Sequence, residues 1–395
     1  MKRIKSIIIC INILTTLTLF SQKKEILVLD SVTNKPVDGV NIFYSEITEG
    51  TFTNADGKAE INLKEFDLKI SHINYEEKTI AYKDLENTTT ILIKLKTNLL
   101  DEVIVSSFNL KKALNYVLEN YESLYVNEPF EKECIFKESL TVNGNLKRFI
   151  LSKVNWWGNS YKVKFTDDLK LRLASIDFNK NIAMDIFTDS EKENSPSKSG
   201  NIATSNLIAV IYLNTTLTNF LKYSEGLNSI VEASPPNQII VSFETDWSKV
   251  KNGSEKCKGK ITFDKETKAI IAFMIAVDKN DEIIKGLTSI SKKQYSIENT
   301  DSVSDYVFAK GINNKWTLNS AEIKANVDII YNNKTYKNSV TNNILVLKEI
   351  SVKKVNNKGL IDLTKPIFES LPSSEITNAN SILLSEEEKK FIYGK

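Results

Sequence analysis

The chain has one histidine, His72, among its 395 residues. A hydrolytic zinc site built on two imidazoles is therefore excluded. His72 shares strand parity with Leu68 and Ile70, so we expect its ring in or beside a core and not in a catalytic cleft. The 13 glycines are dispersed, and no phosphate-binding loop is present. Carboxylate chemistry stays open, but no pair of acids stands out. We predict a non-enzymatic protein with no catalytic, cofactor-binding or metal-ligating residues.

The chain also has few cysteines and a small net charge. Cys10 lies in the N-terminal apolar run, which leaves Cys134 and Cys257, too few for a disulfide scaffold and not clustered as in a zinc site. A disulfide between these two is a hypothesis, because an oxidising compartment would allow it. The 52 basic and 50 acidic residues nearly cancel, so no strong field points to nucleic acid or to an anionic membrane.

The N-terminus has the three parts of a secretory signal. Met1–Lys5 is basic, residues 6–20 are apolar, and the small Ser21 precedes Gln22. The apolar run is shorter than the roughly 20 residues that a spanning helix needs. We predict cleavage after residue 21, no transmembrane segment in the mature chain, and a periplasmic or outer-membrane-associated protein.

Residues 22–106 predict a compact β domain. Short alternating strands follow one another, as in Lys58–Leu63, and turns such as Asn54–Gly57 separate them. About seven or eight such strands at this spacing favour a β-sandwich.

Several segments of this domain carry a family resemblance. Val28–Ile42, Thr53–Gly57, Leu68–Glu76 and Leu100–Val105 follow the order of motifs in the carboxypeptidase-like regulatory domain family of Bacteroidota, which the sequence resembles. Asn74 stands where that family usually has glycine. The resemblance implies a prealbumin-like β-sandwich that precedes another envelope domain. It does not imply peptidase activity.

Residues 107–350 predict a larger domain with a curved antiparallel sheet and a few helices, so the whole chain is mainly β, of the α+β class. Apolar residues at helical spacing predict a helix over Leu110–Tyr121, and Asn143-Gly144 predicts a hairpin turn. The segment Lys260–Ile270 resembles a hairpin of Bacteroidota envelope proteins with a large curved sheet, distantly similar to lipoprotein carriers. We expect the tail, residues 351–395, to lie along the surface.

Three residues are candidates for a ligand or partner surface. Trp156 and Trp157 are adjacent in a strand, so they face opposite sides and one of them is expected to point outward. The segment Ala269–Val277 is apolar on both faces, which predicts that both faces are covered. The cover over Met274 is then either the chain itself or an apolar ligand.

Three functions follow from these features. The first is a binding or adaptor role in the cell envelope, with an unknown protein or glycan as partner. The second is a carrier that holds an apolar ligand in the curved sheet. The third is an accessory subunit or domain of an envelope enzyme. A filled core favours the first, an open apolar cavity the second, and a cleft with converging carboxylates would favour an enzyme.

Overall fold

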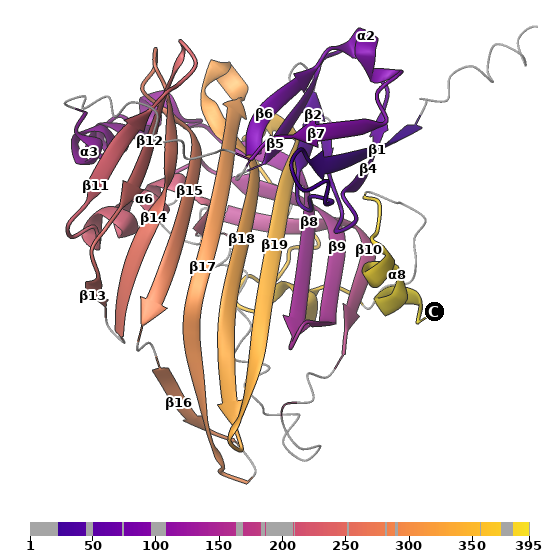
Figure 1. Cartoon of the computed structure of the whole chain (residues 1–395), viewed down its shortest axis with the longest axis vertical. Coiled ribbons are helices and arrows are strands. Elements are labelled where there is room, and N and C mark those ends of the chain that lie inside the picture. Colours follow the sequence, from indigo (N-terminus) through magenta and orange to yellow (C-terminus); the bar gives the residue numbers. More distant parts are fainter. Residues whose placement is uncertain are drawn as a thin grey trace, which may run out of the picture. The chain divides into compact units, whose positions relative to one another are not determined.

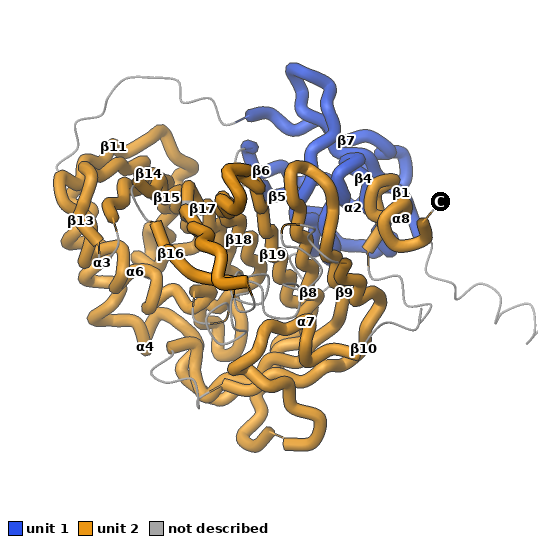
Figure 2. Tube along the Cα trace, turned by 90° about the horizontal axis from the view of Figure 1, so that it is seen from below, with its two compact units in different colours: residues 1–96 blue, residues 97–395 orange. Residues whose placement is uncertain are grey.

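The computed structural model describes residues 23–44, 50–72, 75–95, 108–162, 169–182, 186, 208, 210–250, 253–280, 283–288, 291–355, 357–372 and 382–394. The predicted signal peptide, the predicted boundary at residue 106 and the closing motif Leu100–Val105 lie outside these residues. The chain divides into two compact units, residues 1–96 and residues 97–395 (Figure 2).

Unit 1 is a sandwich of two sheets. One sheet has the order β4-β1-β7 and the other β3-β2-β5-β6, and all pairs are antiparallel except the parallel β1 and β7. Alternating apolar residues such as Val28, Ile42 and Ile70 fill the space between the sheets, which confirms the predicted β-sandwich. The elements are β1 (Lys23–Asp30), β2 (Asn41–Tyr44), β3 (Gly50–Phe52), β4 (Lys58–Asn62), β5 (Leu68–His72), β6 (Tyr75–Ile80), α2 (Tyr82–Leu85) and β7 (Thr90–Ile93).

Polar residues of the sequence motifs hold the turns of unit 1. The carboxylate of Asp30 accepts the backbone N–H groups of Val32 and Thr33, and the Thr33 bond is the main reason that the pKa of Asp30 is lowered. Gly57 has a φ of +70°, and a Cβ there would lie 2.5 Å from a backbone oxygen, so the turn requires glycine. The ring of His72 packs edge-on against Tyr75 at 5.1 Å, at the margin of the core.

Unit 2 is built on one 12-stranded antiparallel sheet (Figure 1). Its order is β10-β9-β8-β19-β18-β17-β15-β14-β12-β11, with β13 paired to β14 and β16 paired to β17. The strands are β8 (Phe130–Val142), β9 (Asn145–Gly158), β10 (Leu169–Asn181), β11 (Asn228–Glu232), β12 (Gln238–Glu244), β13 (Ser248–Val250), β14 (Gly253–Asp264), β15 (Ile270–Asn280), β16 (Ile283–Leu287), β17 (Gln294–Lys310), β18 (Trp316–Tyr331) and β19 (Lys334–Ser351).

Local turn signals place the hairpins of this sheet. Asn143 and Gly144 have φ values of 51° and 78°, as the predicted type I′ turn requires. β17 runs without a break through the polar stretch between Glu298 and Asp305. A register shift between Asn299 and Asp301 carries the strand through this polar stretch, and Asp301 accepts a hydrogen bond from the Asn326 side chain at 2.6 Å.

Short helices cover one face of the sheet (Figure 2). They are α3 (Leu110–Glu119), α4 (Tyr121–Leu124), α6 (Leu213–Lys222) and α7 (Ile367–Ser370). The predicted helix at residue 110 is confirmed, and the Asn109 side chain caps it by accepting the Lys112 N–H at 2.9 Å. We call this side of the sheet the helix-covered face.

The C-terminal segment is part of unit 2. Ile361, Ile367 and Leu371 lie in the core of the helix-covered face, so the prediction that residues 351–395 run along the surface is wrong for them. Helix α8 (Glu386–Tyr393) packs on the opposite face, where Glu388 pairs with Lys137 of β8 at 2.8 Å.

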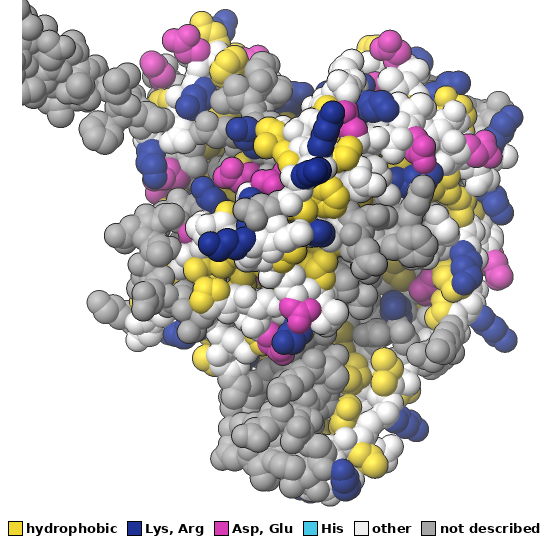
Figure 3. All heavy atoms as spheres, turned by 180° about the vertical axis from the view of Figure 1, so that it is seen from behind, with side chains coloured by type: hydrophobic (Ala, Val, Ile, Leu, Met, Phe, Trp, Pro, Cys, Tyr) yellow, Lys and Arg dark blue, Asp and Glu magenta, His cyan; other side chains and the backbone are white. Residues whose placement is uncertain are grey.

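The surface shows no dominance of one charge. On the side seen in Figure 3, basic and acidic side chains lie among apolar ones. Among the described residues, none of the helices has both the length and the apolar character needed to cross a bilayer.

Candidate functional site

Tyrosines join the helices to the sheet on the helix-covered face. Tyr161 stacks on Tyr212 at 5.2 Å, and Trp156 meets Tyr212 edge-on at 5.3 Å. The hydroxyl of Tyr161 donates to the Ile211 carbonyl at 2.7 Å. Burial raises the pKa of Tyr161 well above its usual range, so the phenol stays protonated and acts as a donor.

Tyr125 completes the backbone hydrogen bonding of β15. A register shift at Ile271 bends β15 where it pairs with β14, and Ile270 lies opposite Phe263 of β14. On the other side, the pairing of β15 with β17 stops at Ala272, so β17 offers no partner to Ile270. The Tyr125 hydroxyl accepts the Ile270 N–H at 2.9 Å and donates to the Ile270 carbonyl at 3.0 Å. One phenol therefore satisfies both backbone groups of a buried residue.

A charged pair lies inside the aromatic layer. The Lys132 ammonium is fully buried and lies 2.5 Å from a carboxylate oxygen of Glu349, whose side chain is 6% exposed. It also donates to the Thr317 hydroxyl at 2.7 Å and to the Leu318 carbonyl at 3.0 Å. The rings of Phe130, Trp156 and Tyr161 surround it, with centroids 5.3, 5.7 and 5.9 Å away.

Electrostatics keep Glu349 ionised in this place. Burial alone would raise the pKa of Glu349, but the charge of Lys132 and the hydrogen bonds from Lys132, Ile312 and Thr317 outweigh it and lower that pKa. Sequence reasoning missed this pair. The parity of Lys132 with Phe130 and Cys134 was a usable signal, because it places the ammonium on the core face.

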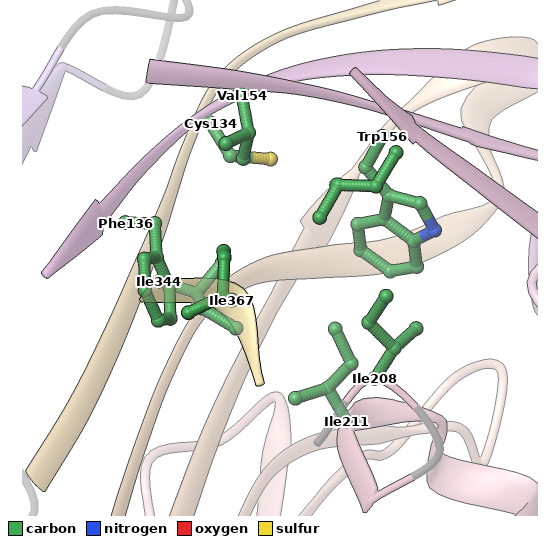
Figure 4. Close-up of a pocket in the computed structure, with 9 residues that line it drawn as sticks. Cys134, Phe136, Val154, Trp156, Ile208, Ile211, Ile344 and Ile367 are labelled. Atoms are coloured by element: carbon green, nitrogen blue, oxygen red, sulfur yellow. The ribbon is translucent and has the colours of Figure 1, made fainter. Parts of the chain in front are cut away.

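A small apolar cavity lies beside this cluster (Figure 4). Its volume is about 30 Å³, room for roughly one or two water molecules. Side chains from the sheet, from the segment before α6 and from α7 point into it; they include Cys134, Phe136, Trp156, Ile211, Ile344 and Ile367. Around this cavity the buried residues of the helix-covered face form one apolar cluster.

Comparison with known proteins bears on the first unit. Residues 27–105 match the CarboxypepD_reg-like domain family. This supports the predicted domain, and we call it the regulatory-like domain. No curated protein is similar enough to the chain to count as a match. The large sheet lies outside the matched residues.

The predicted surface residues do not meet at one place. Trp156 is in the core, whereas Trp157 faces the other side and its indole N–H donates to the Val352 carbonyl at 3.1 Å. Met274 is on β15, with β8, β19, β18 and β17 between it and Trp157 on β9. The three candidates therefore do not form one surface.

The prediction that the chain itself covers both faces of Ala269–Val277 is wrong, and cover of the Met274 face by an apolar ligand stays a prediction. The shift at Ile271 turns Ile270 toward the core, on the face of Phe273 and Ile275. Ala272 and Met274 lie on the other face and stay partly exposed, and Met274 is flanked by Lys260 and Asp305 on the neighbouring strands. Sequence alone gave no sign of this shift, which reverses the parity of Ile270.

The disulfide hypothesis is also wrong, because Cys134 and Cys257 are both free thiols. Four strands separate β8 from β14, and at about 4.8 Å per strand the cysteines are far beyond the roughly 7 Å between Cα atoms that a disulfide tolerates. Burial raises the pKa of each thiol to about 12. Neither is poised as a thiolate nucleophile.

Among the described residues of the regulatory-like domain and of unit 2, no group of three or more His, Cys, Asp and Glu side chains is placed to hold a metal ion. Lys132 and Glu349 are engaged with each other and are sealed from solvent. On the helix-covered face, the aromatic rings and the buried ion pair join the helices to the sheet in one core.

Proposed function

We propose that this chain is an exported, non-catalytic binding protein of the cell envelope, with a protein or a glycan as partner. Binding takes place on its surfaces and not in an interior pocket. The basic, apolar and small-residue pattern of residues 1–21 supports export. A regulatory-like domain joined to a separate unit whose buried residues pack into one apolar cluster supports a binding or adaptor role.

The filled helix-covered face is the observation that carries this proposal. Sites for small molecules commonly have volumes of roughly 300–1,000 Å³. The cavity beside Trp156 has about 30 Å³. A carrier of an acyl chain would need about ten times this space between the sheet and its helices. The partly exposed face around Met274 is the surface that we assign to a partner.

Titration with an uncharged fluorescent lipid probe tests this choice. We expect no saturable one-to-one binding and no energy transfer from Trp156, because the cavity cannot admit the probe. Ile208→Trp, which adds bulk at the cavity wall, serves as the matched variant. Saturable binding to the natural chain that is lost in Ile208→Trp would contradict the proposal and would favour the carrier.

A further inference from the structure

The two edges of the large sheet differ. At the β10 edge, two register shifts interrupt the strand, and the C-terminal segment covers it, since the Ile361 N–H donates to the Leu171 carbonyl at 2.8 Å. At the other edge lies β11, the strand labelled at the left side of the sheet in Figure 1. It pairs with β12 without a register shift and contains neither proline nor lysine, which are features that commonly protect an edge.

The pairing of β12 decides which backbone groups of β11 point outward. The Thr245 N–H donates to the Cys257 carbonyl at 2.8 Å, so the odd-numbered residues of β12 bond to β14. The even-numbered residues of β12 therefore bond to β11, and the residues opposite them on β11 are also even-numbered. The N–H and C=O groups of Ser229 and Val231 then point away from the sheet, and they have no hydrogen-bond partner among the described residues.

Ile230 lies between these two outward-pointing residues, and its side chain is 49% exposed. It stands on the face of Met274, because Ser242 and Lys260 join the two residues in one row across β12 and β14. The carboxylate of Glu232 pairs with the Lys260 ammonium at 2.7 Å. β11 therefore presents an apolar side chain between open backbone groups, and its one charged residue is already paired.

This strand is complementary to a second copy of itself. When two β11 strands run antiparallel about a two-fold axis through Ile230, Ser229 of one copy lies opposite the partner's Val231, and their backbone groups bond to each other. Ile230 then meets the partner's Ile230 at the closer, non-hydrogen-bonded position, as an apolar pair. Asn228 meets the partner's Glu232, which places an amide donor beside a carboxylate. No like charges of β11 are brought together.

We propose that two copies of this chain associate edge to edge through β11, which joins their large sheets into one. The two-fold axis stands normal to the sheet, so the Met274 faces of both copies lie on the same side. The proposal does not depend on the partner assigned to that face. Pairing over so short a strand is small beside the roughly 1,200–2,000 Å² of a stable interface, so we expect a weak dimer with a Kd on the order of micromolar.

Sedimentation equilibrium over a micromolar concentration series tests the proposal, using the chain from Gln22 onward, which keeps every described element. We expect a monomer–dimer equilibrium. Ile230→Lys places two like charges opposite each other across the axis and should weaken association by at least about tenfold. Ile350→Lys is the matched control, because Ile350 is 42% exposed on β19, far from β11 in the strand order. It adds the same charge and should associate as the natural chain does.

Ile230→Cys tests the register of the pairing. Facing residues at a non-hydrogen-bonded position have Cα atoms about 4.5 Å apart, within the range that a disulfide spans. We expect this variant to form a covalent dimer under mild oxidation, and Ile350→Cys to form none. The two natural cysteines that follow Gln22 are buried, so they do not compete.

Three results would overturn the proposal. The first is a natural chain that stays monomeric throughout the series; an extended peptide that then bound at β11 would assign the edge to another protein. The second is Ile230→Lys that associates as tightly as Ile350→Lys, which would place the contact on another surface. The third is Ile230→Cys that cross-links no faster than Ile350→Cys.

Discussion

Glu349→Gln is expected to lower the free energy of unfolding by about 3–5 kcal/mol, because it leaves the Lys132 charge buried without its counter-ion. The ammonium is fully buried, and three aromatic rings exclude water from it. Urea denaturation at neutral pH, extrapolated linearly to water, measures the change.

Two further variants make the Glu349 test specific. Glu266→Gln removes an exposed carboxylate from a turn and should change stability by less than about 0.5 kcal/mol. Lys132→Met combined with Glu349→Leu removes both charges and should recover most of the loss. A loss below about 1 kcal/mol for Glu349→Gln alone would mean that water reaches Lys132, and it would contradict the buried pair.

The stability that the Lys132–Glu349 pair contributes depends on pH. The pKa of Glu349 is lowered from its ordinary value of 4.5, so the carboxylate is favoured in the folded state. Its contribution to stability is present above pH 4.5 and is lost as the pH falls toward the folded pKa. The difference in stability between the natural chain and Glu349→Gln should therefore shrink as the solution is acidified below that value.

Tyr125→Phe is expected to cost about 2–4 kcal/mol, because it leaves the N–H and the carbonyl of Ile270 unpaired in a core. Ile270 is fully buried, and both of its hydrogen bonds go to the Tyr125 hydroxyl. Denaturation measures the cost, and hydrogen exchange should show faster exchange of the Ile270 amide. Tyr116→Phe, at a partly exposed position on α3, should change neither. Unchanged exchange at Ile270 in Tyr125→Phe would show that the bulge finds other partners.

The sandwich and the hairpins could be predicted because their signals are local. Gly57 and the Asn143-Gly144 pair specify positive φ values within a few residues, and Asn109 caps its own helix. Register shifts have no such signal. The polar stretch around Thr300 is held as strand by its partners on β18, through a register shift between Asn299 and Asp301.

The site depended on strand order, which the sequence does not contain. Lys132 finds Glu349 because β8 lies beside β19 in the sheet, although the two strands are far apart along the chain. The same order separates Cys134 from Cys257. Both cysteines lie in strands and are buried, but these shared properties do not bring them close together.

The central claim is that this chain binds on its surface and holds no ligand in its core. Native mass spectrometry of protein purified from the envelope tests it most directly. We expect the mass of the chain that begins at Gln22, or twice that mass, with nothing else bound. An apolar molecule that stays bound to the natural chain and is absent from Ile208→Trp would contradict the claim, because it would have to lie between the sheet and its helices.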